Sequence, residues 1–483
     1  MAQLKPLFVG IDVGTEGVRA VAASASGEIV GSVSVPHEQP KFQLPDGWFE
    51  QDASLWWETT KLALATLCKR VDVCDIVALS VTSTSGTFVP VDKSGKPLRN
   101  ALMYSDMRAI EEADEVRQCA HELEAKLGYR IQPSFALPKM LWLKKHEPHI
   151  FEMCAKLLHA ADFIVSKLTG IVGVSDFSNA LKTCFDLVEM RFPEWIESAL
   201  GIPIDKLPKV VAPGDEIGFV SSDVAEEIGM PTSIVVVAGA TDGTAAFICS
   251  GAKCIGEWNS NLGSTLVLRG LCKRIIPDER GRIYYHRHPD GFWLSGAASS
   301  TGGECLRVRF PNKDLAAMDE MALRCIPTKL LIYPLVRRGE RFPFVNGHAE
   351  GFVVGEPKDE AELYAAHIEG VAFVERWCFE VFEQVGHDIC GTVFITGGGS
   401  KSKLWNIVRS SVLRRALVRP KTIEAAFGAA IIAASRKWFS SLSEAASIMV
   451  QLEETIEPCE GLSKAYEDAY MRFREECERR GYE

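Results

Sequence analysis

Long apolar runs and paired cysteines are both missing from this sequence of 483 residues. No stretch approaches the roughly 18 consecutive apolar residues that a membrane-spanning helix needs. The 14 cysteines are scattered without a CxxC pair, which speaks against a zinc knuckle or a disulfide framework. The first residues carry one lysine and a very short apolar run, unlike a secretory signal. These absences predict a cytoplasmic protein with reduced thiols.

Positive charge is also in deficit. The 53 Lys and Arg residues face 64 Asp and Glu residues, which gives a formal net charge of −11. This balance argues against a nucleic-acid partner and weakens the idea of a sugar-sensing regulator that binds DNA. An acidic protein can still bind phosphates through backbone N–H groups and a metal. At this length we expect roughly two to four domains.

Residues 8–20, FVGIDVGTEGVRA, predict two strands joined by a tight turn, because β-branched residues favour strands and glycine permits positive φ. The turn at residues 14–17 lacks the lysine of a GxxxxGKS/T phosphate loop, and its glycines do not follow GxGxxG. Such a hairpin could bind a phosphate on its N–H groups, with Asp12 holding a hydrated Mg²⁺. The alternatives are an ordinary edge hairpin and a carboxylate that bonds the turn amides.

The second half of the sequence repeats the pattern of the first. Residues 256–269 predict another hairpin around a small-residue turn, with Asn261 where the first hairpin has its carboxylate. The apolar strand at 76–81 ends in the hydroxyl-rich residues 82–87, and a later strand ends in the glycines of 392–400. Two similar α/β lobes facing one another would bring these loops into one cleft. A solvated Ser/Thr turn is the alternative for residues 82–87.

Asp242 follows the buried strand predicted at residues 233–240 and stands among Gly, Ala and Thr, which are too small to block a substrate. Phosphoryl transfer needs a group that orients the attacking hydroxyl and accepts its proton. Asp242 is therefore the candidate base, and its alternative role is to cap a helix that begins at Gly243.

With these pieces placed, the sequence resembles the FGGY carbohydrate kinases, members of the actin/hexokinase/Hsp70 fold group. The resemblance runs nearly end to end, and each motif is weak alone. The motifs that carry it are GIDVGTEGVRA (10–20), DGWFEQD (46–52), YSDMRA (104–109), GATDGTAA (239–246), LGSTLVLRG (262–270), FITGGGSKSKLW (394–405) and EAAFGAA (424–430).

The resemblance implies an α/β fold of two actin-like, ribonuclease H-like lobes of mixed sheet with flanking helices and an inter-domain active-site cleft. On this basis we expect an N-terminal lobe at residues 1–248 and a C-terminal, nucleotide-side lobe at 249–440. A separate helical segment is expected at 441–483.

The resemblance also implies roles for single residues. Asp242 would be the catalytic base, and Asp12 would bind Mg²⁺ through water, which places the metal on the N-terminal side of the cleft. The cofactor would be Mg·ATP. Its γ- and β-phosphates would contact Gly14 and Thr15, a second phosphate loop would consist of Gly263, Ser264 and Thr265, and the adenosine would lie along Gly397, Gly398, Gly399 and Ser400.

The loop after the strand at 76–81 helps to select the sugar in this family. Glycerol kinases carry an Arg-Glu pair there and xylulokinases a Met-His-Gly, whereas this sequence has Thr84-Ser85-Gly86 followed by a threonine. That loop resembles the ribulose-kinase branch. Hydroxyl groups suit a polyhydroxy ligand because each can donate and accept a hydrogen bond.

Three further residues are candidates for sugar binding. Trp48 could form an apolar wall, while Asp106 and Arg108 could bond or orient the sugar. The alternatives are core packing for Trp48, and a helix cap with a surface ion pair for the other two. His286 and His288 resemble a metal pair, but a solvated loop is favoured because no third ligand is evident.

These features predict an ATP-dependent kinase that phosphorylates a terminal hydroxyl of a pentulose, with D-ribulose as the favoured substrate. D-xylulose is the runner-up, and another ketose or a polyol comes third. The rival from another class is a sugar-independent ATPase or nucleotide-binding protein on the same fold. The expected partners are a sugar and ATP, with no nucleic acid and no membrane, and a homodimer stays open.

Overall fold

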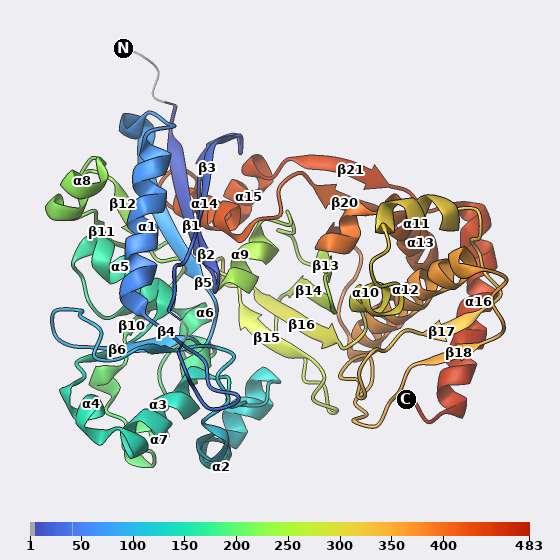
Figure 1. Ribbon diagram of the computed structural model, residues 1–483, viewed down its shortest axis with the longest axis horizontal. Coiled ribbons are helices and arrows are strands. Elements are labelled where there is room, and N and C mark those ends of the chain that lie inside the picture. The colour runs from blue at the N-terminus through green and yellow to red at the C-terminus, as the bar shows by residue number, and fades with distance from the viewer. Residues whose placement is uncertain (1–4, 41) are drawn as a thin grey trace. The chain divides into compact units, whose positions relative to one another are not determined.

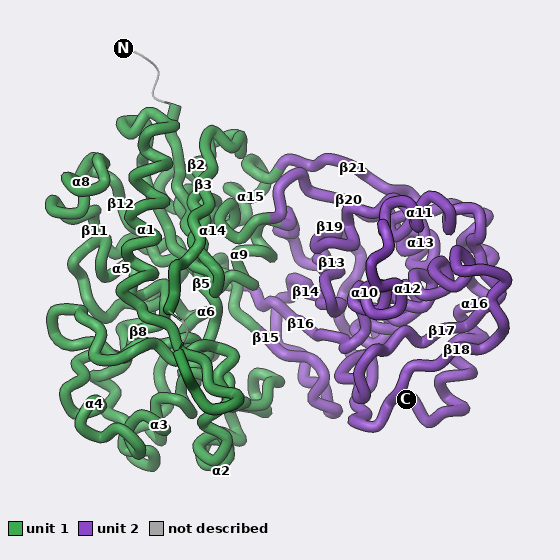
Figure 2. Tube along the Cα trace, in the orientation of Figure 1, with its two compact units in different colours: residues 1–249, 286–291, 424–450 green, residues 250–285, 292–423, 451–483 purple. Residues whose placement is uncertain are grey.

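The chain forms two compact units of mixed α/β structure in a computed structural model that describes residues 5–40 and 42–483 (Figure 1). The first unit comprises residues 1–249, 286–291 and 424–450, and the second comprises 250–285, 292–423 and 451–483 (Figure 2). The sequence-based boundaries differ from this division at residues 286–291 and at the end of the chain. Residues 424–450 return to the first unit, and the remaining residues belong to the second instead of forming a separate segment.

The first unit is built on a six-stranded sheet with the order β11-β12-β5-β1-β2-β3. Strand β1 pairs with β2 in antiparallel fashion and with β5 in parallel, so the predicted first hairpin is present. The strands are β1 (Leu7–Val13), β2 (Gly17–Ser24), β3 (Ile29–Pro36), β5 (Ile76–Ser83), β11 (Glu216–Phe219) and β12 (Val235–Val237).

Side chains alternate along β1, so apolar residues face both sides of the sheet. Helices cover both of these faces. Val9, Ile11 and Val13 pack toward α1 (Ala53–Cys68) and α5 (Ala160–Thr169). Phe8 packs on the opposite face, against α9 (Asp242–Ile248), α14 (Ala425–Ser435) and α15 (Leu442–Met449). The same alternation places Gly10 and Asp12 on the face of α9 and α14.

Helix α14 approaches β1 so closely that only glycine fits at position 10. A Cβ atom there would lie 1.8 Å from the carbonyl oxygen of Ala426 and 2.4 Å from the nitrogen of Ala430. Gly428 is equally constrained, because its Cβ would lie 2.1 Å from the carbonyl oxygen of Ala245 in α9. This packing explains why residues 424–450 belong to the first unit although the second unit intervenes in the sequence.

A smaller sheet of the first unit, with the order β4-β7-β6-β8, carries the candidate sugar loops. Its strands are β4 (Glu50–Gln51), β6 (Phe88–Val91), β7 (Ala101–Leu102) and β8 (Lys156–His159). The elements around it are α2 (Ile110–Leu127), α3 (Ala136–His146), α4 (Pro148–Met153), α6 (Phe177–Ala180), α7 (Trp195–Ser198), α8 (Ser222–Ile228), and the pair β9 (Val174–Asp176) and β10 (Lys209–Val211).

The second unit repeats the strand pattern of the first. Its sheet runs β15-β16-β14-β13-β19-β20-β21, with β13 antiparallel to β14 and parallel to β19. In register, Asn261 faces Thr396 as Asp12 faces Thr82. The strands are β13 (Trp258–Leu262), β14 (Leu266–Cys272), β15 (Tyr284–Arg287), β16 (Trp293–Ser299), β19 (Val393–Thr396), β20 (Leu417–Pro420) and β21 (Leu452–Ile456).

The helices of the second unit pack around this sheet and a hairpin of two short strands. Helix α12 is the longest, and its many buried residues make it central to the unit. These elements are α10 (Glu304–Arg309), α11 (Leu315–Ala322), β17 (Leu331–Tyr333), β18 (Phe352–Val354), α12 (Glu360–Val385), α13 (Lys403–Leu413) and α16 (Glu460–Arg479). No helix in the described part of the chain is both long and apolar enough to cross a membrane.

Candidate functional site

The turn between β1 and β2 has the geometry of an anion-binding loop. The N–H of Gly14 donates to the carbonyl oxygen of Gly17 at 2.9 Å, which closes the turn and leaves Asp12 out of that contact. Within the described part of the chain, no hydrogen bond uses the N–H of Thr15 or Glu16. Neighbouring N–H groups without a partner are what a phosphate requires. We call residues 14–17 the first phosphate loop.

Asp12 lies at the end of β1, on the face where α9 and α14 begin. Burial, together with the negative charges of Asp242 and Glu424, raises the pKa of Asp12 to about 7, although the nearby Arg19 opposes this rise. Arg19 also pairs with Glu424 at 3.2 Å. The two predicted carboxylates, Asp12 and Asp242, therefore affect one another electrostatically.

Asp242 is the first residue of α9, while Thr241 holds the N-cap position. A carboxylate oxygen of Asp242 accepts a hydrogen bond of 2.6 Å from the N–H of Gly243. Two contacts fix the chain just before it: Thr82 donates its hydroxyl to the carbonyl of Ala240 at 2.7 Å, and the N–H of Thr241 donates to the hydroxyl of Ser178 at 2.9 Å. These two hydrogen bonds fix the backbone immediately before the candidate base.

The two carboxylates suit a magnesium ion that is bound mainly by phosphate and water. Mg²⁺ in nucleotide sites uses one or two carboxylates and keeps several waters. A cation next to Asp12 would favour its ionised carboxylate and so offset the burial and the charge repulsion that raise its pKa. Among the described residues, no group of three or more His, Cys, Asp or Glu side chains could hold a metal alone. His286 and His288 therefore do not belong to such a group.

Asp106 and Arg108 form a buried pair in the first unit, and neither lies on the surface. Asp106 accepts hydrogen bonds from Phe49 N–H at 2.6 Å and from Arg108 Nε at 2.9 Å. The guanidinium of Arg108 also bonds Glu50 at 2.8 Å and lies 3.8 Å from the ring centre of Trp48. Asp106 is not a helix cap, because α2 begins four residues later. The structure therefore brings the three candidates Trp48, Asp106 and Arg108 together.

A buried lysine holds the hydroxyl-rich loop that follows β5. Thr84 and Thr87 share a hydroxyl contact of 3.1 Å, and Gly86 adopts a φ of +87°. Fully buried Lys139 donates from Nζ to the carbonyl oxygens of Gly86 at 2.8 Å and Met103 at 2.6 Å. Burial lowers the pKa of Lys139 to about 7. Sequence reasoning missed this residue because its partners lie far away in the chain.

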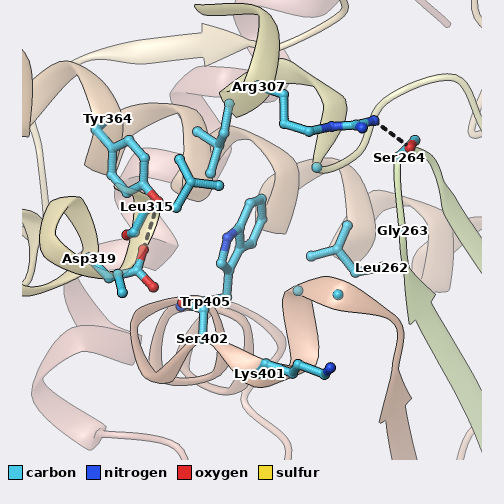
Figure 3. Close-up of a pocket in the computed structure, with 15 residues that line it drawn as sticks. Leu262, Gly263, Ser264, Arg307, Leu315, Asp319, Tyr364, Lys401, Ser402 and Trp405 are labelled. Atoms are coloured by element: carbon cyan, nitrogen blue, oxygen red, sulfur yellow. Dashed lines mark hydrogen bonds between the residues drawn. The ribbon is translucent and has the colours of Figure 1, made fainter. Parts of the chain in front are cut away.

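A pocket of about 470 Å³ lies in the second unit, at the end of β13 (Figure 3). Four of the predicted nucleotide residues line it, whereas Thr265, Gly397 and Ser400 do not. The predicted residues in the lining are Gly263, Ser264, Gly398 and Gly399.

The other walls of this pocket come from α10, α11, α12 and α13, and of these only α13 follows a motif that the sequence analysis identified. Trp405 of α13 points into the pocket, and Arg307 of α10 reaches across to donate to the hydroxyl of Ser264 at 2.7 Å (Figure 3). Tyr364 donates its hydroxyl to Asp319 at 2.7 Å. An aromatic wall, glycine backbone and one arginine can bind a nucleoside with attached phosphates.

Comparison with known proteins supports these assignments at the level of the family. Residues 7–249 match the N-terminal domain of the FGGY family of carbohydrate kinases, and residues 286–436 match its C-terminal domain. The xylulose kinase of Bacillus subtilis is 27% identical over 461 residues, which cover 92% of this chain and 91% of that protein. The gluconokinase of the same organism is 25% identical over 95% of this chain and 93% of its own.

Solved structures agree with this result. The crystal structure of xylulose kinase from Rhodospirillum rubrum has a TM-score of 0.85 and 25% identity, and the match covers 98% of each chain. The Plasmodium falciparum glycerol kinase with ADP has a TM-score of 0.86 at 19% identity and 98% coverage of both chains, which shows a shared fold. The expected two-lobed α/β architecture and sugar-kinase chemistry are confirmed, and the chain belongs to the FGGY family of carbohydrate kinases.

Proposed function

We propose that this kinase transfers the γ-phosphate of Mg·ATP to a terminal hydroxyl of a pentulose, with D-ribulose as its first substrate. The observation that carries the proposal is the placement of Asp242 at the start of α9, on the same sheet face as Asp12 and the start of α14. A base, a metal-side carboxylate and a turn with unused N–H groups are the parts that phosphoryl transfer needs.

In the proposed reaction, the hydroxyl oxygen of the sugar attacks the γ-phosphorus. A carboxylate oxygen of Asp242 accepts the proton that this hydroxyl loses. The N–H groups of the first phosphate loop bind the phosphate oxygens on which negative charge is spread. Asp12 would hold Mg²⁺ through water, and the ion would neutralise negative charge on the phosphates. The bond from the γ-phosphorus to the bridging oxygen breaks, and ADP and a sugar phosphate result.

The nucleoside is proposed to bind in the pocket of the second unit. The backbone at Gly398 and Gly399 would lie against it, with Trp405 as the apolar wall. Ser264 and Arg307 would contact the phosphates, because a guanidinium and an N–H turn both favour negative charge.

The sugar is proposed to bind the hydroxyl-rich loop of the first unit. Thr84 and Ser85 are only half-buried, so their hydroxyls can bond those of a ligand. Trp48, backed by Arg108, offers one wall. D-ribulose is favoured because the loop lacks the Met-His-Gly of xylulokinases. D-xylulose is the second candidate, since several relatives that match over most of their length are named xylulose kinases.

The test is ADP release measured with a panel of ketopentoses, other ketoses, polyols and gluconate, together with a blank that contains no sugar. We expect release to depend on D-ribulose, with a kcat/KM above that for D-xylulose. A higher value for D-xylulose would overturn the D-ribulose assignment and keep the pentulose class. Release that ignores every sugar would support the ATPase rival, and activity only with gluconate or a polyol would refute the pentulose class.

A further inference from the structure

Every carbonyl group of the first phosphate loop is engaged by the protein. Gly17 accepts from the N–H of Gly14, and Glu16 accepts from the N–H of His37 at 2.8 Å. The carbonyl of Gly14 accepts from the ring of His37, and that of Thr15 accepts from the side chain of Gln51. All four carbonyls are thus held by donors of the protein, whereas the N–H groups of Thr15 and Glu16 have no acceptor within the described chain.

His37 is a half-buried histidine whose ring links the loop to α1. Its Nε2 lies 3.2 Å from the carbonyl oxygen of Gly14, and its Nδ1 lies 3.0 Å from the hydroxyl of Thr59 in α1. A carbonyl cannot donate, so Nε2 carries the hydrogen. Burial lowers the pKa of His37, which favours a neutral ring with an unprotonated Nδ1. The Thr59 hydroxyl also lies 2.7 Å from the carbonyl oxygen of Leu55, so its single hydrogen is shared between Nδ1 and that carbonyl.

Gln51 makes an equivalent contact through an amide whose orientation is fixed. The indole N–H of Trp56 donates to Gln51 Oε1 at 2.7 Å. Because an indole only donates, the opposite end of the amide must be the NH₂ group. That group donates from Nε2 to the carbonyl of Thr15 at 2.8 Å.

Both contacts lead back to α1. Trp56 and Thr59 are three residues apart, so they lie on the same face of the helix. Trp56 is buried among the core residues of the first unit, which makes it a firm support. The loop is therefore connected at two points to one rigid helix.

We propose that His37 and Gln51 are positioning residues that hold the carbonyls of the first phosphate loop away from the bound phosphate and so keep its N–H groups directed toward it. This inference rests on the proposed function, in which that loop binds the phosphates of ATP. Without these contacts the peptide groups at Gly14 and Thr15 can rotate, and a carbonyl oxygen facing a phosphate repels it. Neither residue touches the reacting atoms.

The test compares His37→Leu and Gln51→Leu with the wild type in direct binding of ATP and of adenosine, alongside KM for ATP and for the sugar. We expect each variant to bind ATP about tenfold more weakly, which corresponds to roughly one net hydrogen bond. Adenosine binding and the KM for sugar should stay within about twofold, because neither involves the loop. The conservative His37→Gln, which keeps an N–H donor near the position of Nε2, should recover most of the ATP affinity.

Gln39→Leu is the matched control. Gln39 makes two backbone hydrogen bonds to Asp52, next to Gln51, but none to the loop. It should leave ATP affinity within about twofold. Unchanged ATP affinity in both leucine variants would overturn the inference, as would equal losses for ATP and adenosine or a control that behaves like them. A wild type that shows no sugar-dependent ADP release would instead overturn the proposed function. If His37→Leu does not fold, Gln51→Leu and His37→Gln decide the question.

Discussion

Replacing Asp12 by asparagine is expected to stabilise the protein while it removes kinase activity. The carboxylate of Asp12 is largely buried, and its pKa rises from 3.8 to about 7 on folding. Each pKa unit corresponds to about 1.36 kcal/mol, so keeping Asp12 ionised costs the folded state about 4 kcal/mol at pH 8. Because the folded-state pKa is raised, the cost is fully present above pH 7. It falls as the pH drops toward 3.8, to about 2 kcal/mol at pH 5.

Thermal unfolding without Mg²⁺ or nucleotide tests this expectation. At roughly 2 °C per kcal/mol for a unit of this size, Asp12→Asn should exceed the wild type in Tm by about 8 °C at pH 8 and by about half as much at pH 5. The exposed Asp468 of α16 gives the control, since Asp468→Asn should change Tm by no more than about 1 °C at either pH. Equal Tm values for Asp12→Asn and the wild type at pH 8 would refute the reasoning, as would a difference that grows toward acid pH.

Three further predictions address the base, the packing and the sugar. Asp242→Asn should lower kcat by about 10²–10⁴ while ATP affinity stays within about twofold, and near-normal turnover would contradict the base assignment. Gly10→Ala should cost about 3 kcal/mol in chemical unfolding because its methyl would lie 1.8 Å from the backbone oxygen of Ala426. Gly461→Ala, in a helix with open space around it, should stabilise by about 0.5–1 kcal/mol. Arg108→Lys should raise the KM for sugar at least about tenfold, because lysine lacks the planar fork, and leave the KM for ATP unchanged.

The sequence predicts elements well where the signal is local. The first hairpin and the apolar strand expected at residues 76–81 are present as β1, β2 and β5, and Asp52 caps α1 through the N–H of Ser54. Alternating or continuous apolar residues, glycine turns and a capping carboxylate all act within a few residues of one another. The repeat of the pattern in the second half also follows from such local signals, and the matching strand pairings of the two sheets confirm it.

Features that depend on distant partners were not predicted. Strand β21 is missed because only Ile456 of its five residues is buried, so no alternation marks this edge strand. Lys139 meets Gly86 across 53 positions in the sequence, and His37 meets Gly14 across 23.

The close packing of α14 on β1 has a consequence for synthesis of the protein. Residues 1–249 leave the ribosome before the helix at residues 425–435 exists. At about 5–20 residues per second, the roughly 200 residues up to position 450 take on the order of 10–40 s. During that interval Phe8 and its apolar neighbours have α9 against them but neither α14 nor α15. The first unit therefore completes its folding only after most of the second has been made, and a gene fragment that stops at residue 249 encodes a protein that lacks α14 and α15 on one face of its sheet.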